Sequence, residues 1–119
     1  MLTNKKILIT GANGGLGMAI IQEALARNVQ KIYACVRDVH NAKALISLDP
    51  RIEVHTLNTT ESHSVESLAT TIESVDIVIN NAGVNSEKRV LAVCRSDFDV
   101  NVFGTLNVCR AFENKIAPN

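Results

Sequence analysis

The chain has 119 residues and no net charge, because twelve basic residues balance twelve acidic ones. Hydrophobic residues make up 46% of it and charged residues 20%, a composition typical of one globular domain that excludes a disordered or fibrous chain. A neutral chain with 3% aromatic residues also lacks the charge and the stacking surface expected of a nucleic-acid-binding protein.

Predicted strands and helices alternate along the chain. Runs rich in β-branched residues predict strands at 6–10, 31–36, 52–57 and 75–80. Helical periodicity predicts helices at 16–27, 42–48 and 64–74, the first with an apolar stripe of Leu16, Ile20 and Ala24. A last helix is predicted to begin near Ser96, where Ser-x-x-Asp matches a capping pattern. Its predicted apolar face is Phe98, Val102, Leu106 and Cys109.

This alternation predicts an α/β fold in which a parallel sheet carries helices on both faces. No repeat or linker interrupts the sequence, so residues 1–119 are expected to form one domain. The strand at 75–80 is apolar on both faces, as a central strand should be. Because an open apolar edge invites pairing, we expect either a domain truncated before a fifth strand or a homo-oligomer that covers this edge.

No feature of the sequence predicts a membrane segment or a metal site. The longest apolar run, at 75–79, is far shorter than the roughly 20 residues of a membrane span. The first ten residues do not form a signal peptide, so a cytoplasmic location is expected. Cys35, Cys94 and Cys109 match neither a disulfide framework nor a metal-ligand spacing, and are expected to be buried, reduced thiols.

Four of the six glycines lie in Leu-Ile-Thr-Gly-Ala-Asn-Gly-Gly-Leu-Gly, residues 8–17, between a predicted strand and a predicted helix. The first N–H groups of a helix lack intrahelical partners and carry partial positive charge, so they can bind a diphosphate. Gly11 would allow the tight turn, Gly15 the approach of the phosphates and Gly17 the close packing of helix on strand. A strand–helix connection without a ligand is the alternative.

Three motifs in order resemble the short-chain dehydrogenase/reductase family. They are Thr-Gly-x-x-x-Gly-x-Gly at 10–17, Asn-Asn-Ala-Gly at 80–83, and the helix segment Asp-Phe-Asp-Val-Asn-Val-Phe-Gly-Thr-Leu-Asn-Val at 97–108. The segment that begins at Leu57 is also similar to the one after the third strand in acyl-carrier-protein reductases of this family. The resemblance covers nearly the whole chain. It implies a partial Rossmann-like, doubly wound parallel sheet with four strands in the order 3-2-1-4.

The resemblance also implies a nicotinamide dinucleotide as cofactor. Asn58 would accept a hydrogen bond from the adenine amino group, unless it only shapes the turn after its strand. The motif at 81–83 would lie beside the ribose and the nicotinamide, at the carboxyl ends of the strands. The implied cofactor-binding residues are Thr10, Gly11, Asn13, Gly14, Gly15, Leu16, Gly17, Arg37, Asp38, Asn58, Thr59, Asn81, Ala82 and Gly83.

Arg37 and Asp38 decide between NADP and NAD. They follow the second predicted strand about 20 positions after the glycines, where the adenosine ribose is bound. An arginine binds a 2′-phosphate by charge and bidentate geometry, whereas a carboxylate binds the free hydroxyls and repels the phosphate. We favour NADP through Arg37. Gly14 stands where family reductases often have a second basic residue, so NAD remains possible.

In this family, hydride passes between the nicotinamide and a carbonyl or alcohol with the help of an asparagine, a serine, a tyrosine and a lysine. Of these four, only the asparagine has a counterpart, Asn101. The single tyrosine, Tyr33, has Arg37 four positions later, so the chain contains no Tyr-x-x-x-Lys pattern. We therefore expect the cofactor-binding part of an oxidoreductase, inactive as this chain alone. A non-catalytic dinucleotide-binding sensor or interaction module is the alternative.

Overall fold

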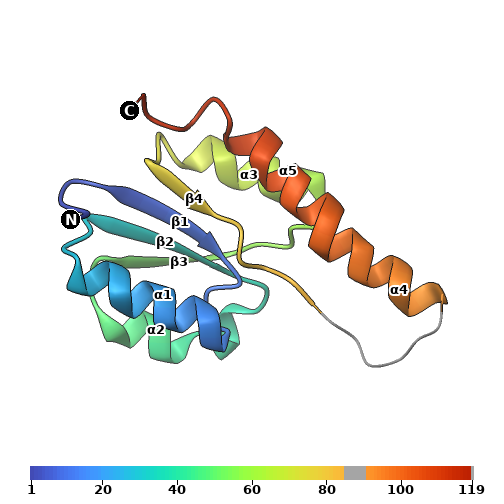
Figure 1. Cartoon of the computed structure of the whole chain (residues 1–119), viewed down its shortest axis with the longest axis horizontal. Coiled ribbons are helices and arrows are strands. Elements are labelled where there is room, and N and C mark those ends of the chain that lie inside the picture. The colour runs from blue at the N-terminus through green and yellow to red at the C-terminus, as the bar shows by residue number, and fades with distance from the viewer. Residues whose placement is uncertain (85–90, 119) are drawn as a thin grey trace.

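The computed structural model describes residues 1–84 and 91–118 as one α/β unit (Figure 1). η1 is a 3₁₀-helix and η2 a π-helix. In chain order the elements are β1 (Lys6–Thr10), α1 (Gly15–Ala26), β2 (Lys31–Val36), η1 (Val39–Asn41), α2 (Lys43–Leu48), β3 (Ile52–Thr56), α3 (Ser62–Thr71), β4 (Ile77–Ile79), α4 (Leu91–Phe98), η2 (Asp99–Gly104) and α5 (Thr105–Phe112).

The four strands form one parallel sheet in the order β3-β2-β1-β4. The predicted order and the doubly wound arrangement are therefore confirmed. β1 is central: Ile7 is in register with Ile32 of β2 on one side and Ile77 of β4 on the other. In Figure 1, α1 and α2 cover one face of the sheet, and α3 and α5 cover the other. All four strands end at the same edge, where parallel sheets bind ligands.

Alternation along β1 explains the two cores. Ile7 and Ile9 are buried on the side of α1 and α2, whereas Leu8 is buried on the side of α3 and α5. Val108 and Phe112 of α5 complete the second core. Burying these apolar side chains on both faces is the main source of stability, at about 25 cal/mol for each Å² removed from water.

Several predicted element boundaries shift. α1 and α2 lie within a residue of their predicted bounds, but α3 spans Ser62–Thr71 instead of 64–74, and β4 is only three residues long. Leu16 was expected in the buried stripe of the first helix but is 68% exposed. It lies in the first turn of α1, beyond the reach of the sheet, and the buried positions are Gly17, Ile21 and Ala24.

The prediction for the last helix was wrong in its start and in its face. Ser96 lies inside α4, so it does not cap a helix start. Phe98, Val102 and Leu106 are exposed, whereas Val108 and Phe112 are the buried residues of α5. Phe98, Val102 and Leu106 do share one apolar face, but that face is exposed because α3 packs against the other side of α5, where Val108 and Phe112 lie. The π-helical residues of η2 also interrupt the regular spacing on which the prediction relied.

β4 is the last strand in the sheet order, as predicted for an apolar edge. Just before it, Val75 forms a parallel bridge with Ile116: Lys115 accepts a hydrogen bond from Val75 at 2.9 Å, and Ala117 donates one to Val75 at 2.8 Å. The homo-oligomer expected at this edge stays a prediction. In the described part of the chain, no helix combines the length and the apolar character needed to cross a membrane.

Candidate functional site

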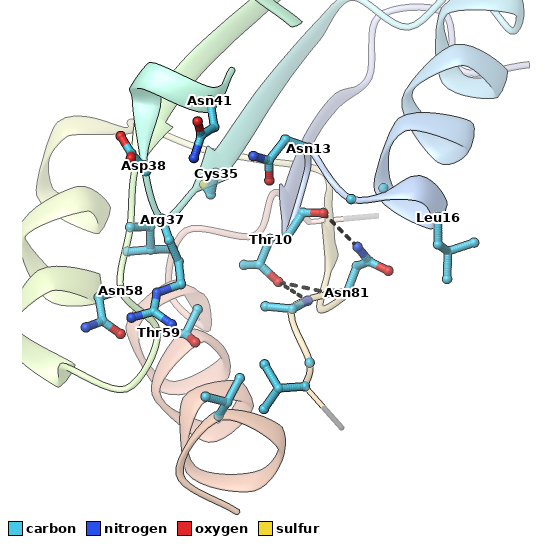
Figure 2. A pocket seen from close by; sticks show the side chains of 18 of the residues that line it. Thr10, Asn13, Leu16, Cys35, Arg37, Asp38, Asn41, Asn58, Thr59 and Asn81 are labelled. Carbon is cyan, nitrogen blue, oxygen red and sulfur yellow. Dashed lines mark hydrogen bonds between the residues drawn. The ribbon is translucent and has the colours of Figure 1, made fainter. Parts of the chain in front are cut away.

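A cavity of about 540 Å³ opens where the four strands end (Figure 2). Its wall contains every residue predicted to bind the cofactor, from the glycine loop, the ends of β2 and β3, and the segment after β4. Sequence reasoning missed Cys35, Asn41, Leu57, Val84 and Val100, which also line it. The rule that ligands bind at strand ends would have found Cys35 and Leu57. Val84 and Val100 come to the same cavity only through the tertiary fold, for which the sequence carries no local signal.

The glycine loop is tightly packed on its inner side. Gly11 has a φ of +62°, a left-handed conformation that other residues rarely adopt, and a Cβ there would lie 3.0 Å from Ala82 Cα. A Cβ on Gly17 would collide with the carbonyl oxygen of Gly11 and lie 2.9 Å from that of Ala12. These two glycines let the strand, the turn and the helix approach one another.

The outer side of the same loop is open. A Cβ on Gly15 would meet nothing within 4 Å, and Gly15 is both the first residue of α1 and part of the cavity wall. Within residues 1–84 and 91–118, no side chain caps the start of α1, where Gly14 takes the N-cap position. The first N–H groups of the helix thus lie beside open space, which fits a bound diphosphate.

Thr10 joins the loop to the segment after β4. Its hydroxyl oxygen accepts hydrogen bonds from the backbone N–H groups of Asn81, at 3.1 Å, and Ala82, at 2.9 Å. The side-chain amide of Asn81 in turn donates to the carbonyl oxygen of Gly11 at 3.0 Å. These bonds connect residues about 70 positions apart and hold two walls of the cavity together (Figure 2).

Arg37 and Asp38 point in different directions. Figure 2 shows the side chain of Arg37 running toward Asn58 and Thr59, with Asp38 directed away from them. One carboxylate oxygen of Asp38 accepts a hydrogen bond from the backbone of His40 at 2.9 Å and caps η1. Arg37 makes no hydrogen bond or ion pair with any residue in the described ranges, so its guanidinium is available to an anion in the cavity.

The turn after β3 is braced by Asn58. Its amide oxygen accepts hydrogen bonds from the backbone N–H of Thr60, at 3.1 Å, and from the Thr60 hydroxyl, at 2.7 Å. Its amide nitrogen donates to Glu61 at 3.2 Å. Asn58 therefore shapes the turn as well as lining the cavity. Its predicted bond to adenine would add to an oxygen that already has two donors, so that role stays a prediction.

Asn101, the predicted catalytic asparagine, lies in η2 and contacts the residue that follows the Asn-Asn-Ala-Gly motif. Its side-chain oxygen accepts a hydrogen bond from the Val84 backbone N–H at 2.7 Å, and its nitrogen donates to the Val84 carbonyl at 2.6 Å. This two-point pairing attaches the helix to a residue of the cavity wall. No spacing rule predicts it, since the partners are 17 positions apart.

The cysteines differ more than expected. Cys35 is buried in the cavity wall, and burial raises the pKa of its thiol to about 12. Cys94 and Cys109 are exposed, so the expectation of three buried thiols was wrong for these two. The sulfur of Cys109 accepts a hydrogen bond from the side-chain amide of Asn80, just after β4, at 3.5 Å.

We predict that iodoacetamide at pH 8 modifies Cys94 and Cys109 in the folded protein, and Cys35 only after unfolding, because the thiolate is the reactive form. Peptide mapping by mass spectrometry with and without urea measures this directly. Equal modification of all three cysteines in the folded protein would contradict the burial of Cys35.

Among the described residues, no group of three His, Cys, Asp or Glu side chains could hold a metal ion.

A family model described as "short chain dehydrogenase" matches residues 5–117. A short-chain dehydrogenase/reductase of Pestalotiopsis microspora is 34% identical over 113 residues, which cover 91% of this chain and 41% of that protein. The NADPH-dependent 1-acyldihydroxyacetone phosphate reductase of Saccharomyces cerevisiae is 32% identical over 119 residues, 89% of this chain and 40% of that protein. The chain thus spans less than half the length of these curated relatives.

Solved structures agree with the family model. The crystal structure of a short-chain dehydrogenase from Burkholderia cenocepacia in complex with NADP matches with a TM-score of 0.87 and 30% identity. The match covers 97% of this chain and 49% of that one. The described fold therefore corresponds to about half of that protein.

Proposed function

Because the chain belongs to the short-chain dehydrogenase family, we propose that it forms the nucleotide-binding part of an NADP(H)-dependent oxidoreductase. The reaction proposed for the whole protein is hydride transfer between the nicotinamide and a carbonyl or alcohol group. Relatives named as dehydrogenases and reductases favour this over a non-catalytic sensor.

The observation that carries the proposal is the form of the glycine loop. Gly11 and Gly17 have no room for a side chain, whereas Gly15 faces open space at the uncapped start of α1. Packing within the chain does not require glycine at position 15, so the close approach of a ligand to the backbone would explain it. The backbone N–H groups at the start of α1 are placed to donate to a diphosphate, with the favourable partial charge of a helix N-terminus.

Arg37 supports NADP over NAD. Its guanidinium lies in the cavity wall, unpaired within the described residues, where it would bind a 2′-phosphate. The Asp38 carboxylate, which would repel that phosphate, points away from Arg37, and one of its oxygens accepts a hydrogen bond from the backbone of His40 (Figure 2). The yeast relative is named as NADPH-dependent and the Burkholderia structure contains NADP, which supports the same choice.

When bound, the nicotinamide would supply or accept the hydride. In this chain the segment from Asn81 to Val84 would border it, held in place by Thr10 at one end and by Asn101 at the other. The catalytic role of Asn101 stays a prediction, and its contacts to Val84 add a positioning role. With no Tyr-x-x-x-Lys pattern in these 119 residues, we expect no turnover from this chain alone.

Direct titration tests the proposal. The chain has no tryptophan, so the fluorescence of NADPH can be followed during binding without interference from indole emission. We expect saturable binding of NADPH that is tighter than that of NADH, and no oxidation of NADPH when carbonyl compounds are added. Absence of NADPH binding would contradict the proposal, and clear turnover would contradict the expected inactivity.

The change Arg37→Ala should weaken NADPH binding and leave NADH binding unchanged. A hydrogen bond to a charged group contributes about 1.5–3 kcal/mol, so we expect the Kd for NADPH to rise roughly 10- to 100-fold. The titration described above measures both constants. Because NADH lacks the 2′-phosphate, it reports whether the rest of the site is intact.

Two further variants complete this test. Arg27→Ala removes the same charge at the far end of α1, where Arg27 pairs with exposed Glu23, and should change neither affinity. Asp38→Asn distinguishes the alternative: if Asp38 binds the ribose hydroxyls, this change weakens NADH binding and Arg37→Ala has little effect. That pattern would overturn the preference for NADP.

A further inference from the structure

Thr59 is held from outside the cavity by two residues near the end of the chain. The side-chain nitrogen of Asn107, in α5, donates a hydrogen bond to the carbonyl oxygen of Thr59 at 2.9 Å, across 48 positions of sequence. Gly104, the last residue of η2, packs against the same threonine. A Cβ on Gly104 would lie 2.7 Å from Thr59 Oγ1 and 3.1 Å from Thr59 Cβ. Thr59 itself is only 8% exposed.

Thr59 belongs to the cavity wall, but Asn107 and Gly104 do not. Figure 2 shows Thr59 beside Asn58 and the guanidinium of Arg37, so this wall is the one next to the proposed 2′-phosphate position. Asn58 ties the turn internally through Thr60 and Glu61, which sets its shape. The position of this turn relative to β2 and the cavity also depends on the residues that pack behind it, which are Gly104 and Asn107 at the junction of η2 and α5.

We propose that Asn107 and Gly104 are positioning residues for the adenosine half of the cofactor, which they affect through Thr59. The inference rests on the proposed function, since it requires a dinucleotide in this cavity. A wall held in its binding geometry beforehand loses less conformational freedom when the ligand arrives, so affinity is higher. Releasing the Thr59 carbonyl from Asn107 should therefore weaken binding at this wall, without changing the groups that line the glycine loop.

The experiment divides the ligand into its two halves. Isothermal titration with 2′,5′-ADP reports on the adenosine wall, and NMR titration with nicotinamide mononucleotide reports on the glycine loop and the segment after β4. For Asn107→Leu, which keeps the branching and the number of heavy atoms of the side chain and removes the donor, we expect 2′,5′-ADP to bind roughly fivefold more weakly, the equivalent of one net hydrogen bond. Nicotinamide mononucleotide should bind as it does to the unmodified chain.

Control variants exclude a general loss of structure. Asn114→Leu makes the same exchange at an exposed position just beyond α5 and should change neither affinity. Asn107→Ser, which is polar but too short to reach Thr59, should reproduce the effect of leucine even if Asn107→Leu folds poorly. Gly104→Ala, which pushes on Thr59 from the same side, should also weaken 2′,5′-ADP selectively.

Each outcome decides whether Asn107 and Gly104 position the adenosine wall. Selective weakening of 2′,5′-ADP supports the inference. Equal weakening of both halves shows a merely structural role and overturns it, as does unchanged binding of both, while the proposed function stands. If the unmodified chain binds neither 2′,5′-ADP nor NADPH, the proposed function fails and the inference fails with it.

Discussion

Replacing Gly17 with alanine should abolish NADPH binding and lower the free energy of unfolding. The new Cβ would collide with the carbonyl oxygen of Gly11 and lie 2.9 Å from the oxygen and 3.0 Å from the carbon of the Ala12 carbonyl. All of these are backbone atoms, which cannot rotate away as a side chain would. We expect a loss of about 1–3 kcal/mol, the usual cost of overpacking, measured by urea unfolding. The turn must move, and the helix start that would bind the diphosphate moves with it.

Gly15→Ala is the matched comparison, because it places the same methyl group two positions away in the same helix. That Cβ meets nothing within 4 Å, so the free energy of unfolding should stay within about 0.5 kcal/mol of the unmodified chain. NADPH binding should still weaken, since the methyl group occupies the space assigned to the phosphates. Normal stability of Gly17→Ala would contradict the packing described here. Normal NADPH affinity of Gly15→Ala would show that the phosphates do not lie against this residue.

The parts of the fold that depend on local pattern were predicted well. The strand at Lys31–Val36 has its predicted bounds, and the order β3-β2-β1-β4 follows from the family resemblance. The buried face of the last helix was predicted wrongly, because an apolar stripe shows which residues can be buried and not which neighbour buries them. Phe98 and Leu106 have the spacing of one apolar helix face, but they are exposed because α3 packs on the other side of α5.

The candidate site shows the same division. The glycine spacing implied a tight turn at Gly11 and close packing at Gly17, and the structure has both. The contacts at Gly17 are with Gly11 and Ala12, a few residues away, whereas the contact of Gly11 with Ala82 depends on the whole fold. The pairings of Asn101 with Val84 and of Asn107 with Thr59 could not be read from the sequence. Each pairing joins a helix to a loop that is distant in sequence, and the two come together only in the folded chain. Neither pairing produces a periodic pattern in the sequence.

Thr10→Val is the second change with a large expected effect. Valine has nearly the same shape but no hydroxyl, and Thr10 is only 2% exposed. The N–H of Asn81 would keep its second acceptor, the carbonyl oxygen of Ile79 at 3.1 Å. The N–H of Ala82 would lose the acceptor it has at 2.9 Å. This hydrogen bond is part-buried, and a donor left without a partner away from water costs about 1–3 kcal/mol, so we expect the free energy of unfolding to fall by roughly 2 kcal/mol.

Thr10→Ser separates the hydroxyl from the methyl group. Serine keeps the acceptor and removes one buried methyl group, which should cost about 1 kcal/mol and leave NADPH affinity nearly unchanged. The valine variant should bind NADPH more weakly, because the segment from Asn81 to Gly83 loses its attachment to the end of β1. Urea unfolding and NADPH titration of both variants give the comparison. If valine is as stable as serine and binds NADPH equally well, the Thr10 hydroxyl does not hold the two walls of the cavity together.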